Sequence, residues 1–124
     1  MESHHQITTA QWFKIQYPKH KDCFISIPNE RSKKAGMSQG QFIGYLKKLK
    51  KMGMKTGVSD IFIAIPKGEY HGMWLELKDE GKSINDVTDS QKEHLNLMRE
   101  MGYCATWAAG SDSAIAKIKK YMEL

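Results

Sequence analysis

Two apolar segments of strand length, joined by a short loop, constrain the fold of this chain most. Residues 57–65 and 72–78 are rich in Ile, Phe, Trp and Leu, and Gly or Pro bounds them. The loop between them, residues 66–71, contains Gly68 and has the length of a hairpin connection. The pattern therefore predicts a β-hairpin.

Charged residues occupy unusual positions in this hairpin. Asp60 stands at the entrance of the first strand, and Glu76 and Lys78 lie within the second. Charges on a largely buried strand are costly unless they are paired or bind a metal. Because Glu76 and Lys78 are two residues apart, they point to the same face of the strand and Leu77 points to the other. These residues suit a divalent cation with an adjacent general base or charge stabiliser.

The rest of the chain alternates between helical and strand patterns. Helices are predicted over residues 7–17, 38–52 and 88–101 and from residue 111 or 112 onward, and further strands over 22–27 and 103–108. The expected caps are Thr8 or Thr9 for the first helix, Thr88 or Asp89 for the third, and Ser111 or Asp112 for the last. Buried candidates in the third helix are Leu95, Leu97, Met98 and Met101.

The order of these elements predicts an α/β fold. A strand, helix, strand and helix in succession require a crossover connection and at least one parallel strand pair. The expected architecture is a mixed central sheet flanked by helices. At 124 residues the chain is expected to form a single domain over 1–124, with residues 1–21 as an N-terminal helical extension.

The composition of the chain indicates its expected cellular location. No apolar run approaches the roughly 20 residues of a membrane helix, and no signal peptide is visible. Cys23 and Cys104 are predicted to be free thiols in a reducing cytosol. The expected location is cytoplasmic, in a bacterial cell or a phage-infected host.

The formal net charge of +5 is concentrated in two stretches. One follows the strand that ends before Pro28, and the other covers the end of the second helix. Their candidate DNA-contacting residues are Arg31, Lys33, Lys34, Lys47, Lys48, Lys51 and Lys55. These lysines fit either a solvated helix face or a surface that contacts phosphates.

The hairpin charges indicate a specific chemistry. Mg²⁺ prefers oxygen ligands and typically takes one or two protein carboxylates. Asp60 and Glu76 supply carboxylates, and the Leu77 backbone carbonyl can add a neutral ligand. Lys78 can orient a water or stabilise charge on phosphoryl oxygens. From spacing alone, Glu76 and Lys78 fit equally well a strand face that simply meets water.

Two further residues extend this candidate site. Glu30 is an additional carboxylate, either a second-site ligand or a water-mediated one. Gln91, near the start of the third helix, can hydrogen-bond the nucleophile or phosphate without altering the charge. The catalytic candidates are Glu30, Asp60, Glu76, Lys78 and Gln91.

Four short motifs in order give the chain a family resemblance. They are Asn29-Glu30, the segment 57–60 (Gly-Val-Ser-Asp), the segment 72–78 (Gly-Met-Trp-Leu-Glu-Leu-Lys) and Ser90-Gln91. In this order the chain resembles the VRR-NUC (virus-type replication-repair nuclease) family of the PD-(D/E)XK superfamily, in its stand-alone phage and bacterial form. The resemblance runs from about Phe24 to Tyr121. One departure is Ser59, where this family often has Pro.

The resemblance implies a restriction-endonuclease-like core and Mg²⁺- or Mn²⁺-dependent hydrolysis of DNA. It implies that Asp60, Glu76 and the Leu77 carbonyl hold the metal, that Lys78 is the catalytic lysine, and that Glu30 and Gln91 match the upstream acid and the helix glutamine. It also implies a homodimer acting on branched DNA, especially four-way (Holliday) junctions. The alternatives are a nuclease of flaps or other DNA, and a non-catalytic or weakly catalytic nucleic-acid-binding module.

Overall fold

A four-stranded mixed sheet forms the centre of the protein, in a computed structural model that describes residues 2–28 and 36–124. The strands are β1 (Phe24–Ser26), β2 (Ile61–Ile63), β3 (Met73–Lys78) and β4 (Cys104–Ala109), and they lie in this order across the sheet. β1, β2 and β3 are antiparallel neighbours, whereas β3 and β4 are parallel. The predicted hairpin, the parallel pair and the mixed sheet are confirmed.

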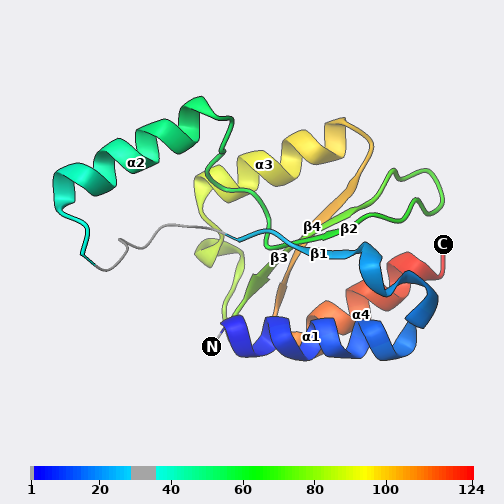
Figure 1. The fold of residues 1–124 in the computed structure, drawn as a ribbon. Helices are drawn as coiled ribbons and strands as arrows, with labels where there is room; N and C mark the ends of the chain where they lie inside the picture. The colour runs from blue at the N-terminus through cyan, green and yellow to red at the C-terminus, as the bar shows by residue number, and fades with distance from the viewer. Residues whose placement is uncertain (1, 29–35) are drawn as a thin grey trace.

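Helices cover both faces of the sheet (Figure 1). α1 (Glu2–Gln16) and α4 (Ser111–Met122) lie together on one face, and α3 (Asp89–Glu100) lies on the other. The face below α1 and α4 is mainly apolar, because Met73, Leu75 and Leu77, alternate residues of β3, point there. Its buried core consists of Phe13, Ile61, Ile63, Ile65, Met73, Leu75, Leu77, Ala108, Ala114, Ile118, Tyr121 and Met122.

Local hydrogen bonds define where two of the helices begin. Ser38 caps α2 (Gln39–Lys51) in a capping box with Gln41, and Thr88 caps α3 in the same way with Gln91. The predicted Thr88 cap is therefore confirmed. In α3, Leu95 is buried as expected, but Leu97 and Met101 are exposed. The predicted burial of these two residues is therefore wrong, because they lie outside the stripe of α3 that faces the sheet.

Two helix starts differ from the prediction. α1 begins at Glu2 rather than residue 7, and Thr9 lies inside it, where its hydroxyl donates to the His5 carbonyl at 2.7 Å. Neither Thr8 nor Thr9 is therefore a cap. At α4 the N-cap is Gly110, and the Ser111 backbone N–H donates to His5 Nδ1 at 3.2 Å, so Ser111 and Asp112 are not caps either.

α2 stands away from the sheet, to the left of α3 in the view of Figure 1. Each of its residues, all of which the structure describes, is half-buried or exposed. None of the helices in residues 2–28 and 36–124 has both the length and the apolarity needed to cross a bilayer. Cys23 and Cys104 are free and half-buried.

Candidate active site

Two charged residues of the hairpin, Glu76 and Lys78, lie on the sheet face that α3 covers. Glu76 and Lys78 point to this face from β3, as predicted, and Lys78 Nζ lies 3.8 Å from Glu76 Oε1. The Glu76 side chain is almost wholly buried, at 1% relative exposure for the residue. A carboxylate removed from water in this way requires charged or hydrogen-bonding neighbours. The alternative of a strand face that simply meets water is therefore wrong.

Gln91 supplies one of those neighbours. Its Nε2 donates to Glu76 Oε1 at 2.8 Å, and its Oε1 accepts the Thr88 N–H at 2.9 Å. The Gln91 backbone N–H in turn donates to the Thr88 hydroxyl. The capping box of α3 thus holds the Gln91 amide in the orientation that directs its NH₂ group at Glu76.

Asp60 reaches the same strand from the turn before β2. Its Oδ2 accepts the Leu77 N–H at 2.9 Å, and its backbone carbonyl accepts the Ile27 N–H at 2.8 Å. The β2–β3 pairing ends at Ile61 and Leu75, so the Asp60 carboxylate takes the place of the next strand partner. This contact holds the carboxyl group of Asp60 beside the β3 backbone.

The Leu77 carbonyl points toward the Asp60 side of β3. In an extended strand the N–H and C=O of one residue lie on the same side, and those of its neighbours lie on the other. The Leu77 N–H meets Asp60, whereas the Lys78 carbonyl accepts the Gly110 N–H on the β4 side. Asp60, Glu76 and Leu77 therefore offer oxygen donors from one short stretch of structure.

This donor set fits a hard divalent cation. Carboxylate and carbonyl oxygens are the ligands that Mg²⁺ and Mn²⁺ prefer. Among residues 2–28 and 36–124 there is no group of three or more His, Cys, Asp or Glu side chains that could hold a metal. The described residues that could hold such a cation are therefore two carboxylates, Asp60 and Glu76, with the Leu77 backbone carbonyl, a set that fits Mg²⁺ sites completed by substrate and water.

His94 is a residue of this region that the sequence patterns did not indicate. Its Nδ1 lies 3.2 Å from the hydroxyl of Ser59, which is fully buried and directly precedes Asp60. Its ring also packs edge-on against Trp74. Burial, aided by the charge of Lys55, lowers the pKa of His94. The only signal in the sequence is that His94 follows Gln91 by three residues, which puts both near one side of a helix.

The basic candidates fall into two groups. Lys47, Lys48 and Lys51 are exposed on α2, and Lys55 is exposed in the segment after it. The other basic candidates, Arg31, Lys33 and Lys34, lie outside the described residues, and so does the predicted carboxylate Glu30. The described lysines thus form an exposed cationic stretch on α2 and in the segment that follows it.

Comparisons with known proteins agree with this geometry. A solved structure described as a "VRR_NUC domain protein" superposes on the chain with a TM-score of 0.81 and 32% sequence identity. The match covers 99% of this chain and 88% of that one. Comparison with protein-family models and with curated proteins gives no match.

Proposed function

Because the chain belongs to the VRR-NUC family, we propose that it is a divalent-metal-dependent DNA endonuclease that hydrolyses phosphodiester bonds. The observation that carries the proposal is the buried Glu76 carboxylate, which lies within reach of the Gln91 amide and the Lys78 ammonium group. Asp60 contacts the backbone of the same strand, at Leu77. A module that only bound nucleic acid would gain nothing from burying this carboxylate beside a lysine, since burial of charge costs stability. The non-catalytic alternative is therefore disfavoured.

In this proposal, Asp60, Glu76 and the Leu77 carbonyl hold Mg²⁺ or Mn²⁺. The bound cation would polarise the phosphodiester and lower the pKa of a bound water. The Leu77 N–H fixes the orientation of the Asp60 carboxylate, and Gln91 fixes that of Glu76. Glu30 would add a further carboxylate, as a second-site or water-mediated ligand.

Lys78 would act on the reacting phosphate. Its ammonium group lies beside Glu76 and its side chain is largely buried, so its charge is only weakly screened by water. In that position it can stabilise the negative charge that develops on the phosphoryl oxygens, or orient the attacking water. Gln91 would contribute by positioning Glu76 rather than by exchanging protons.

The proposed substrate is branched DNA, with four-way junctions preferred, and the proposed state is a homodimer. The basic residues of α2 would contact phosphates, which gives salt-sensitive binding without a base code. Two sites related by a two-fold axis would suit paired nicks across a junction. A nuclease of flaps or linear duplex is the alternative substrate class.

A cleavage assay tests the catalytic proposal. Labelled four-way junction, flap, single-stranded and linear duplex DNA are incubated with Mg²⁺, Mn²⁺ or a chelator. We expect chelator to abolish cleavage, and Glu76→Ala and Lys78→Ala each to lower the rate about a hundredfold or more. The matched controls Glu100→Ala and Lys120→Ala, at exposed positions of α3 and α4, should retain the wild-type rate. Cleavage that persists in chelator or in Glu76→Ala would exclude this mechanism.

The substrate and the assembly are tested separately. Equal cutting of junction and linear duplex would remove the junction preference but leave the nuclease. Sedimentation equilibrium at micromolar concentration should give twice the 14.2 kDa chain mass. A monomer mass would contradict the homodimer.

A further inference from the structure

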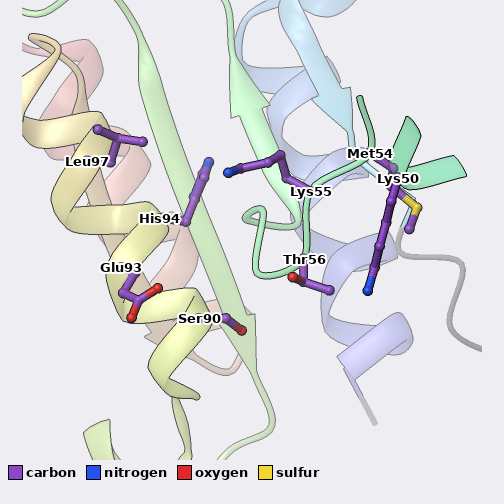
Figure 2. Close-up of a pocket in the computed structure, with 8 residues that line it drawn as sticks. All are labelled: Lys50, Met54, Lys55, Thr56, Ser90, Glu93, His94 and Leu97. Carbon is purple, nitrogen blue, oxygen red and sulfur yellow. The ribbon is translucent and has the colours of Figure 1, made fainter. Parts of the chain in front are cut away.

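A pocket with charged residues in its lining lies next to the candidate active site, between α3 and the segment that follows α2. Its volume is about 420 Å³, within the range of small-ligand sites. Figure 2 shows the residues that line it, which are Lys50, Met54, Lys55, Thr56, Ser90, Glu93, His94 and Leu97. None of these side chains is one of the proposed metal ligands.

Two faces of the fold build this pocket. Ser90, His94 and Leu97 recur at intervals of three or four residues, so they form one stripe of α3, which adjoins the Gln91 and Leu95 stripe that faces the sheet. Opposite them stand residues 54–56 and the last turn of α2. Figure 2 shows the Lys55 side chain pointing toward His94 across the pocket.

The charge balance of the pocket favours an anion. The ammonium groups of Lys50 and Lys55 exceed the single carboxylate of Glu93 by one positive charge. His94 adds no charge near neutral pH, because burial and the nearby Lys55 lower its pKa. One excess positive charge matches one phosphodiester, which carries one negative charge. The hydroxyl of Thr56 and the imidazole of His94 add hydrogen-bonding groups.

The pocket and the active site share a wall. Gly57 packs so closely on the first turn of α3 that an added Cβ would lie 2.9 Å from the Gln91 backbone nitrogen. Ser90 lines the pocket, and the next residue, Gln91, binds Glu76. His94 lines the pocket and also bonds Ser59, which directly precedes Asp60. One nucleic-acid strand can therefore occupy both places.

We propose that this pocket binds a backbone phosphate of the DNA, separate from the phosphate that is cleaved, through Lys50 and Lys55. The inference rests on the proposed function and specifies the path of the strand, which enters between α2 and α3. A phosphate held there fixes the register of the strand at the catalytic residues, as phosphate contacts do in other nucleic-acid complexes.

A coupling experiment between lysines and individual phosphates tests this inference. Binding of a fluorescent duplex with a single-stranded overhang is measured by anisotropy in chelator, so that no cleavage is needed. The DNA carries one neutral methylphosphonate linkage at a time. The proteins are wild type, Lys50→Gln/Lys55→Gln, and the control Lys120→Gln on the exposed side of α4.

We expect the double variant to bind roughly tenfold or more weakly, as charge-assisted contacts of this kind suggest. Its slope of log affinity against log salt should fall by about 1 to 2. One methylphosphonate position should weaken binding by wild type and by Lys120→Gln, and should have no further effect on the double variant.

The outcomes separate the pocket from the nuclease. The pocket assignment would be overturned if each methylphosphonate weakened DNA binding equally in the wild type and the double variant. It would also be overturned if the wild type did not bind DNA. If the protein still cleaved DNA while the methylphosphonates affected both proteins equally, the proposed function would stand and only the pocket assignment would fail. Coupling at one linkage without any cleavage would support the pocket and count against the nuclease.

Discussion

The amide of Gln91 has one partner in the α3 capping box and another in the candidate active site. Its oxygen completes the α3 capping box and its nitrogen donates to Glu76. A glutamate at this position preserves the capping box, since Glu and Gln both fit N3. It would nevertheless place a second carboxylate against Glu76, and two close carboxylates cannot both ionise easily.

We therefore expect Gln91→Glu to lower nuclease activity about a hundredfold while leaving the helix intact. Gln41 is the matched control, because it holds the same N3 position in the capping box of α2 and is exposed. Gln41→Glu should retain both activity and thermal stability. Full activity of Gln91→Glu would show that the Gln91–Glu76 contact has no catalytic role.

His94 makes stability depend on pH. Burial lowers its pKa below the ordinary 6.5, so between these two values the unfolded chain binds a proton that the folded chain does not. Stability then rises with pH in that window and falls as the pH drops below about 6.5. In urea unfolding at pH 7.5 and 5.5, His94→Gln should show a smaller stability loss on acidification than wild type. An unchanged loss would contradict this assignment.

Among the elements, the turn that carries Asp60 depends on close backbone approach. Gly57 has a φ of +82° and lies directly against the Ser90–Gln91 backbone. Gly53 also has a positive φ, of +104°, but an added Cβ there would meet no described atom within 4 Å. Both glycines thus have a positive φ, but only Gly57 also lies in close contact with another described backbone segment.

Gly53→Ala is expected to cost about 1 kcal/mol from the left-handed backbone alone. Gly57→Ala should cost clearly more and also reduce activity, because the clash pushes the turn away from α3 and moves Asp60. Chemical denaturation and the cleavage rate measure both effects. If the two substitutions lowered the free energy of unfolding equally, the turn at Gly57 would be able to move away from α3 without loss of stability.

The outer edge of β4 is covered by cationic side chains. Arg99 Nε of α3 donates to the Ala105 carbonyl at 2.8 Å, and Lys117 Nζ of α4 donates to the Trp107 carbonyl. Burial lowers the pKa of Lys117. An uncovered sheet edge is a template for pairing with another chain, and charged side chains on the edge oppose it.

Removing both contacts should therefore increase self-association. We expect Arg99→Ala/Lys117→Ala to form larger species in sedimentation velocity than wild type does at the same concentration. Lys14→Ala/Lys120→Ala removes the same formal charge at exposed positions and should behave as wild type. Identical distributions for the two double variants would indicate that lost charge, rather than an open edge, controls solubility.

At the scale of the whole molecule, the two sheet faces have separate tasks. The α1 and α4 face holds the apolar core, and the α3 face holds the polar site. α1 contributes Phe13, which is fully buried, whereas Ile15 of the same helix is 81% exposed. The apolar core and the candidate site thus lie on opposite sides of β3.

Phe13→Ala should therefore destabilise the protein by about 3 to 5 kcal/mol through the cavity that it leaves. Ile15→Ala, in the same helix, should change stability by about 0.5 kcal/mol or less. Chemical denaturation at neutral pH measures both. A small effect of Phe13→Ala would show that α1 is not part of the cooperative core.

The sequence alone determined those features that depend on local period or local hydrogen bonds. The spacing of two residues put Glu76 and Lys78 on one face, and the order of strands and helices required the parallel β3–β4 pair. The cap at Thr88 is also local, because its partner is three residues away. Such features do not need the rest of the chain.

Only the tertiary structure decided which distant groups meet. The bonds from Gln91 to Glu76, from Asp60 to Leu77 and from Ser59 to His94 join residues 15, 17 and 35 positions apart. The burial of Phe13 and the pocket between α2 and α3 likewise depend on how helices pack. The physical reason is that periodicity specifies the direction of a side chain within its own element. The partner at the end of that direction is set by the packing of the whole chain.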